Sequence, residues 1–392
     1  MAAKFTRLPA ELLDGIASQV PVTDLLTLCR TNHALYDVSL RWIYHTISPT
    51  TLAGAVKVLK VLTSNQAAAA CVKVLDIHLE FDGVLKSFTR LMKMALVKLT
   101  SLTSLNLSFL PNSFSFFAHT RFPRLRDCQI PFCADTAAFL RLHPTLVKLI
   151  VLPDFVPVNP THPPSPISLP HLRDFSGPAL MARQVVPHSP IELVTLSWDR
   201  SLDEMYHHVL GAFSRMHEPP RVMSNLVSTW DPALLLAIAK HLPHLTVLNI
   251  WKLTTHTGEG TLTGFYDALK TAILDLPHLF TFSFTRIGDD APPTLADLAL
   301  EFSAVRELGS RSATLHVCTF ASNTTWYRIK ENFWYPSAAN KNMAESEWRV
   351  RWLVRGAVET PAEFPGYAEE MEKGLGKARW TELINKLGPS AE

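Results

Sequence analysis

Apolar residues near the start of the chain recur at the spacing of a short helix. They lie three or four positions apart in the first stretch, at Leu8, Leu12, Leu13, Ile16 and Val20. This spacing places them on one face of an amphipathic helix. Pro9 suits its first turn, and Pro21 ends it because proline lacks an amide hydrogen and clashes with the preceding turn. Gly15 lies inside this predicted helix, where it costs about 1 kcal/mol relative to alanine.

Two further helices are predicted before residue 48. Thr23 is expected to cap the second, with Asp24 in its first turn, and Thr31 or Asn32 is expected to cap the third. Their apolar faces consist of Leu25, Leu26 and Leu28 in the second helix, and of Leu35, Val38, Trp42 and Ile43 in the third. Three helices this short bury too little surface to be comfortably stable alone. They form either an ordinary helical cap on a larger fold or a docking module with an apolar interface.

A short motif repeats between about residues 49 and 335. Its best copies are Leu169–Phe175, Leu242–Leu248 and Leu276–Phe282, where Leu-Pro-His-Leu precedes a short tail ending in an apolar residue. Looser copies of the tail alternate apolar and polar residues, which predicts a short strand, and the proline ends the helix before it. We take the first apolar residue of each tail as its anchor, which gives Val72, Leu102, Leu125, Leu146, Leu172, Leu193, Leu245 and Leu279.

Successive anchors lie 21 to 34 residues apart, except for a 52-residue interval in which Pro220–Val222 supplies a degenerate copy. Such a period is typical of a solenoid built from one strand and one helix per unit. We therefore predict an α/β solenoid whose parallel strands line the concave side. Helices such as Ala233–Leu242 and Tyr266–Leu276 are expected on the convex side. Loops are predicted at residues 156–170 and 254–264.

The end of the chain is predicted to close the array. After a last strand at Leu315–Phe320, aromatic residues gather between Trp326 and Tyr335, where they are expected to cover the open end. Helices are predicted at about 342–355 and 367–387. They would pack back on the array through Trp348, Trp352, Leu375, Trp380, Leu383 and Ile384. Alternatively, part of this tail contacts other subunits. The predicted regions are therefore 1–48, 49–335 and 336–392.

Composition narrows the class of function. Hydrophobic residues make up 47% of the chain and charged residues 18%, below the usual value of about 25%, which favours surface hidden on a partner. With 37 basic and 35 acidic residues, the chain lacks the excess of positive charge that is typical of proteins that bind nucleic acid or an anionic membrane. Five cysteines without a CxxC pair predict reduced thiols, hence a cytoplasmic or nuclear protein. Neither a signal peptide nor a membrane span is predicted.

Residue patterns that support catalysis or metal binding were sought among the histidines and cysteines. His171, His244 and His278 occupy the same place in the repeated motif, which indicates a shared structural role. Cys128 and Cys133 are too isolated to indicate zinc. The sequence has no HExxH, no GxSxG and no glycine-rich loop that opens a helix. We therefore predict no catalytic residue, no cofactor and no metal, and a protein that binds and is not an enzyme.

The three N-terminal helices resemble an F-box, across about an eighth of the chain. The residues that carry the resemblance are Leu8-Pro9-x-Glu11-Leu12-Leu13-x-x-Ile16, Pro21-x-x-Asp24-Leu25-Leu26-x-Leu28 and Asn32-His33-x-Leu35-x-x-Val38. Leu35 is a departure, since many F-boxes have tryptophan there. The array that follows resembles divergent leucine-rich repeats, from which the characteristic asparagine is mostly missing. Asn106 and Asn249 are the nearest candidates.

The F-box resemblance implies docking onto the Skp-family adaptor, and through it the cullin, of an SCF-type ubiquitin ligase. By motif position it places at or near that contact Leu8, Pro9, Leu12, Leu13, Ile16, Leu25, Leu26 and Val38. Leu28, Leu35, Trp42 and Ile43 are expected in the core of the bundle. The repeats would then hold an unidentified target protein, for which no binding residues are predicted. Two alternatives remain open: a scaffold that works outside ubiquitination, and a sensor whose solenoid binds a small ligand.

Overall fold

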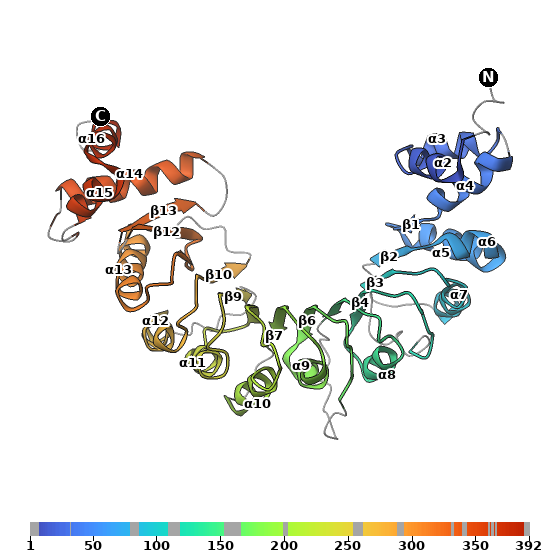
Figure 1. Cartoon of the computed structure of the whole chain (residues 1–392), viewed down its shortest axis with the longest axis horizontal. Coiled ribbons are helices and arrows are strands. Elements are labelled where there is room, and N and C mark those ends of the chain that lie inside the picture. Colours follow the sequence, from blue (N-terminus) through green and yellow to red (C-terminus); the bar gives the residue numbers. More distant parts are fainter. Residues whose placement is uncertain are drawn as a thin grey trace. The chain divides into compact units, whose positions relative to one another are not determined.

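The computed structural model of the chain describes residues 8–31, 33–78, 86–108, 118–152, 166–198, 203–253, 262–287, 294–330, 333–338, 343–359, 361, 364 and 367–387. The fold is α/β, with an open and mostly parallel sheet (Figure 1). The chain forms two compact units, residues 1–191 and 192–392. The predicted region 1–48 lies in the first unit and 336–392 in the second. Most of the predicted loop at 156–170, and most of that at 254–264, lies outside the described residues.

The first unit begins with three helices and continues as strands that alternate with helices. The N-terminal helices are α2 (Ala10–Ala17), α3 (Val22–Leu28) and α4 (His33–Ile43). The strands, all parallel and paired in chain order, are β1 (Thr46–Ile47), β2 (Val74–His78), β3 (Ser104–Ser108), β4 (Asp127–Pro131), β5 (Lys148–Leu152) and β6 (Asp174–Pro178). One face of this sheet carries α5 (Leu52–Ser64), α6 (Gln66–Cys71), α7 (Lys86–Leu96), α8 (Thr136–Arg141) and α9 (Ala179–Val185) (Figure 1). The short helix η2 (Val186–His188) follows α9 directly.

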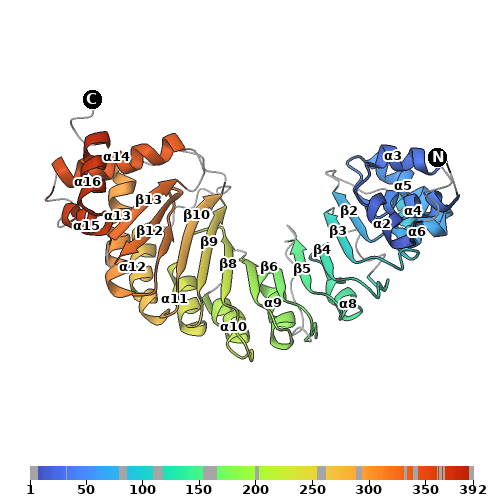
Figure 2. The same ribbon diagram turned by 45° about the horizontal axis from the view of Figure 1, so that its top comes forward.

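The second unit repeats this arrangement and ends in an antiparallel hairpin. Its strands are β7 (Leu193–Ser197), β8 (Val222–Val227), β9 (Val247–Leu253), β10 (Thr281–Ile287), β11 (Val317–Thr319), β12 (Thr324–Lys330) and β13 (Phe333–Ala338). β7 to β11 are parallel, whereas β12 and β13 are antiparallel. Along one face run α10 (Asp203–Phe213), α11 (Pro232–His241), α12 (Leu262–Ala272) and α13 (Leu295–Arg311) (Figure 2). The short helix η3 (Ile273–Asp275) follows α12 directly.

Each repeat is held by an anchor residue two positions before its strand. Seven of the predicted anchors are fully buried: Val72, Leu102, Leu125, Leu146, Leu172, Leu245 and Leu279. The eighth was wrong, because Leu193 is 46% exposed and begins β7 itself. Ile191 is buried at the anchor position, so the motif of this repeat starts two residues earlier than predicted. The degenerate copy at Pro220–Val222 does lead into a strand, β8.

The N-terminal helices join the sheet without a linker. β1 starts three residues after α4 ends, and Ile47 within it is buried. The carbonyl of His45 accepts hydrogen bonds from the amides of Lys73 and Val74, both at 3.0 Å. The predicted cap of the second helix was wrong, since α3 starts at Val22 with Pro21 before it and has no side-chain cap. The bundle is therefore continuous with the first repeats.

The C-terminal helices pack at the β13 end of the second unit. They are α14 (Met343–Glu359), α15 (Tyr367–Leu375) and α16 (Lys377–Leu387). The single helix predicted at 367–387 is broken at Gly376, whose φ of 85° is unfavourable for other residues. Tyr367 donates a hydrogen bond to the carbonyl of Trp334, and its ring packs edge-on against Phe302 of α13. Of the residues predicted for this contact, Trp352 packs against Phe302 and Trp380 is buried. The side chains of Trp348 and Leu375 lie outside the description.

A buried carboxylate ties α13 to the hairpin. Glu301 accepts hydrogen bonds from the amide and hydroxyl of Ser322, at 3.2 and 2.8 Å, and from the indole of Trp326 at 3.3 Å. Burial raises the pKa of Glu301 to about 7, although these donors favour the ionised form. Because the folded pKa exceeds the unfolded one, the stabilisation is complete below about pH 4.5 and is lost as the pH rises through 7.

Replacing Glu301 with glutamine is expected to flatten the pH dependence of the second unit. The amide cannot ionise, so the loss of stability between pH 4.5 and 7, on the order of 3 kcal/mol for the wild type, should disappear. Thermal unfolding of both proteins at pH 5, 6, 7 and 8 measures this effect. The difference in Tm between the wild type and Glu301→Gln should become smaller as the pH rises. Parallel pH profiles for the two proteins would contradict the assignment.

Candidate functional site

The N-terminal helices enclose a small apolar core. Its buried members are Leu13, Ala17, Leu25 and Val38. Partly buried residues pack around them, namely Leu8, Val20, Leu28, Leu35, Trp42 and Ile43. Three of the eight residues that the F-box resemblance assigned to the adaptor contact, Leu13, Leu25 and Val38, therefore lie in this core. Leu28, Leu35, Trp42 and Ile43 pack where they were expected.

The other residues assigned to that contact face outwards, except for half-buried Leu8. Pro9 and Ile16 are exposed, Leu12 is 55% exposed and Leu26 is 50% exposed. Leu12 and Ile16 are four residues apart on α2, so they share a helix face. Val22, which sequence reasoning did not select, is also exposed and shares a face of α3 with Leu26. The bundle thus presents one apolar strip on α2 and another on α3.

Asp14 fastens α2 to α4, a role that the sequence did not reveal. Its carboxylate accepts a hydrogen bond from the indole of Trp42 at 3.2 Å and lies 3.4 Å from the guanidinium of Arg41. Trp42 also stacks on His45, with ring centroids 4.9 Å apart. These contacts link the bundle, through α4, to the first strand. The exposed strip on α2 is consequently fastened to α4.

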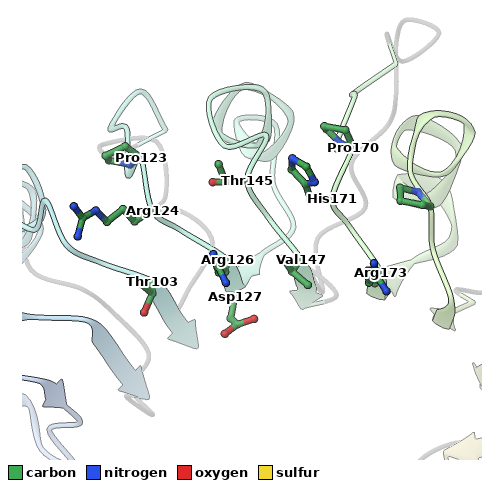
Figure 3. A pocket seen from close by; sticks show the side chains of 11 residues that line it. Thr103, Pro123, Arg124, Arg126, Asp127, Thr145, Val147, Pro170, His171 and Arg173 are labelled. Carbon is green, nitrogen blue, oxygen red and sulfur yellow. The ribbon is translucent and has the colours of Figure 1, made fainter.

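A second candidate site is a groove of about 930 Å³ in the first unit. It runs along the edge of the sheet where β3 to β6 begin (Figure 3). Residues just before the strands form its floor, and the helix-to-strand loops form its walls. The lining residues are Thr103, Pro123, Arg124, Arg126, Asp127, Thr145, Val147, Pro170, His171, Arg173 and Pro190.

The floor of this groove is fixed by a ladder of backbone hydrogen bonds. The carbonyl of Thr103 accepts from the amides of Arg126 and Asp127, at 2.8 and 3.0 Å. The carbonyl of Arg126 accepts in turn from Val147 and Lys148, and that of Val147 from Arg173 and Asp174. Each step repeats the same geometry, so Arg126, Val147 and Arg173 take equivalent places on successive strands (Figure 3). The ladder therefore sets the spacing of the two arginines.

Charge is concentrated in this groove. Three of its eleven lining residues are arginines and one is an aspartate, whereas the whole chain is almost neutral. The adjacent Lys148 and Asp174 form an ion pair at 3.2 Å, so they largely cancel. The hydroxyls of Thr103 and Thr145 donate to the carbonyls of Lys73 and Leu125. The three arginines, Arg124, Arg126 and Arg173, are the other cationic residues that line the groove.

His143 lies three residues before the anchor Leu146 and is fully buried. Its Nδ1 must donate to the carbonyl of Phe139 at 2.8 Å, because a carbonyl only accepts. Its Nε2 accepts from the amide of Phe122 at 2.9 Å. Burial lowers the pKa of His143 to about 4, so the ring is neutral and structural. The histidines of the repeated motif have other surroundings than His143. His171 lines the groove, and His244 stacks on His278.

Polar residues form registered rows on the face of each sheet opposite its helices, although apolar residues such as Val247 and Trp251 share that face. In the first unit, neighbouring strands place Asp127, Lys148 and Asp174 side by side in register. In the second, one registered row across six strands is uncharged and consists of Thr195, Ser224, Asn249, Ser283, Thr319 and Thr325. These rows offer hydrogen-bonding groups to a protein partner.

All five cysteines are free, and burial raises the pKa of the Cys128 and Cys318 thiols, which makes them unreactive. The described residues contain no group of three or more histidine, cysteine, aspartate or glutamate side chains that could hold a metal ion. Among the described helices, none is both long and apolar enough to cross a membrane.

These features define a protein of repeated strand–helix units, with an apolar helical bundle at one end and a cationic groove. The chain matches no protein-family model, and a search of curated proteins finds no similar sequence.

Proposed function

We propose that this chain is the substrate-recognition subunit of an SCF-type cullin–RING ubiquitin ligase. In this proposal α2 to α4 are an F-box that binds the Skp-family adaptor, and the strand–helix units are divergent leucine-rich repeats that hold a target protein. The chain itself performs no chemistry. It raises the effective concentration of the target beside the transferred ubiquitin.

The exposed strips on α2 and α3 carry the proposal. A bundle this small has few apolar residues to spare, yet Leu12, Ile16, Val22 and Leu26 remain exposed while Leu13 and Leu25 fill the core. Large exposed apolar side chains that gather on one element are typical of a protein interface. The motif Leu8-Pro9-x-Glu11-Leu12-Leu13, and its continuation through Val38, supports an F-box as the origin of that interface.

Affinity purification from cells tests this function. The tagged wild-type chain is expected to retain both a Skp-family adaptor and a cullin. A variant with Leu8→Ala and Pro9→Ala should lose both proteins, because these two residues directly precede α2 and its exposed strip. Retention of the adaptor without any cullin would refute the ligase and leave a scaffold. If neither protein is retained by the wild type, the F-box assignment itself fails.

A further inference from the structure

We propose that His207 and His241, in the second unit, bind one divalent transition-metal ion of the zinc type. His207 lies in the middle of α10, and His241 is the last residue of α11. The two helices pack side by side on the same face of the sheet (Figure 1, Figure 2). The ion would therefore join two neighbouring repeats. This inference goes beyond the proposed function, because neither an adaptor nor a target protein takes part in it.

The two ring nitrogens already lie at the separation that a shared ion requires. Nδ1 of His207 is 3.1 Å from Nε2 of His241, and the rings meet edge-on with 61° between their planes. A histidine nitrogen binds zinc at roughly 2.0–2.1 Å, so two nitrogens at an angle of about 90 to 110° on one ion are about 2.9 to 3.4 Å apart. Small rotations of the two side chains would admit the ion.

The pair needs only a change of tautomer to become a chelate. In the free protein one nitrogen of this contact carries the hydrogen and the other accepts it. When an ion takes both lone pairs, that hydrogen moves through solvent to the far nitrogen of the same ring, and the pair loses no proton. His207 is exposed and His241 is half-buried, so both solvent and a small ion can reach them.

Gly211, one helical turn after His207, leaves room for the second ring. A Cβ at this position would lie 3.8 Å from Cε1 of His241 and 4.0 Å from its Nδ1. Alanine would therefore just touch the ring, and any longer side chain would press on it and disturb its position beside His207. The bare backbone of α10 thus lets the two imidazoles meet.

The chemistry of the pair favours a borderline metal ion over a hard one. Imidazole nitrogen suits Zn²⁺, Ni²⁺ and Cu²⁺, whereas Mg²⁺ and Ca²⁺ prefer oxygen ligands. Among the described residues no third histidine, cysteine, aspartate or glutamate joins the pair, so water would complete the coordination. His244 and His278 make a useful contrast, because their rings stack with 24° between the planes. The lone pairs lie in the ring planes, so stacked rings do not direct them at one another.

Hydrogen exchange of the full-length protein, with and without ZnCl₂, tests the site locally. A local measurement is needed because the five free cysteines can bind zinc elsewhere. In peptides from α10 and α11 of the wild type, zinc is expected to slow amide exchange at least threefold, because it joins the two helices. MgCl₂ at the same concentration should leave the rates unchanged. His207→Gln and His241→Gln should each abolish the zinc effect, with every variant compared against its own zinc-free rates.

His208→Gln is the matched control. His208 is an exposed histidine next to His207, but neighbours on a helix point roughly 100° apart, so it does not share the face that meets α11. This variant should keep the full protection by zinc. Unchanged exchange in the wild type overturns the proposal, as does equal slowing by MgCl₂, protection that persists in His207→Gln, or an equal loss in His208→Gln. None of these results bears on adaptor binding, which is measured separately.

Discussion

Glutamate at positions 12 and 26 is expected to abolish adaptor binding by a chain that remains folded. Leu12 and Leu26 are half exposed on α2 and α3, so solvent can accommodate either carboxylate in the free protein. At an interface the same groups would be buried without partners, which costs several kcal/mol in total. We expect the affinity for a purified Skp-family adaptor to fall by at least a hundredfold in calorimetric titration, with unchanged helical circular dichroism.

Two other variants show whether this loss is specific. Leu236 on α11 and Leu300 on α13 are 42% and 50% exposed, and replacing both with glutamate makes the same chemical change far along the chain. That control should bind the adaptor as the wild type does. Leu25→Ala should act differently, because emptying a buried site costs about 2 to 5 kcal/mol and loosens the bundle. Wild-type affinity in the Leu12→Glu, Leu26→Glu protein would refute the assigned interface.

Acidification is expected to destabilise the first unit through His143 by about 3 kcal/mol between pH 6.5 and 4. A second proton would sit on Nε2, where it would face the amide hydrogen of Phe122 and leave a buried cation. The folded pKa lies below the unfolded value, so the stabilisation is present above pH 6.5 and is lost as the pH falls through 4. Hydrogen exchange of peptides from residues 118–152 at pH 7, 6 and 5 measures it locally.

A matched pair of substitutions isolates the histidine. His143→Gln should be less stable than the wild type at pH 7 but should show a weaker pH dependence, because glutamine does not titrate. His119→Gln, at an exposed site in the same segment, should follow the wild-type profile. An unchanged acid response in His143→Gln would show that another group is responsible. Glu301 acts in the opposite direction in the second unit, so a local measurement is needed.

The repeat pattern was predictable from the sequence because each motif consists of residues that are close together in the chain. Anchors such as Leu245 and Leu279 are followed by a strand two residues later, and a proline two residues before each of them follows a helix. Leu193 was misassigned because Ile191 and Leu193 are both apolar and lie two residues apart, so either residue could be the anchor. Only the burial of Ile191 distinguishes them. The break at Gly376 was missed because neighbouring residues keep a helical period. In such cases tertiary packing, not local pattern, decides the outcome.

The groove could not be found in the sequence. Arg126 and Arg173 are 47 residues apart in the chain and are brought together only because each precedes a strand in the same registered sheet. A search for charged residues at the position after each anchor would have selected both. Asp14 is a similar case, since its partners Arg41 and Trp42 lie on another helix. Sites assembled across repeats are therefore visible only once the register is known.

The short strand β1 has a consequence for how a bound target would be presented. Because the bundle passes directly into the sheet, through the paired amides of Lys73 and Val74 on the His45 carbonyl, no flexible tether separates the two binding surfaces. Under the proposed function, the first repeats would form a rigid connection, not a flexible one, between the adaptor and the bound target. A rigid connection exposes only a limited region of the target to the incoming ubiquitin. The choice of acceptor lysine would then follow from the fold of this chain as much as from the target's own sequence.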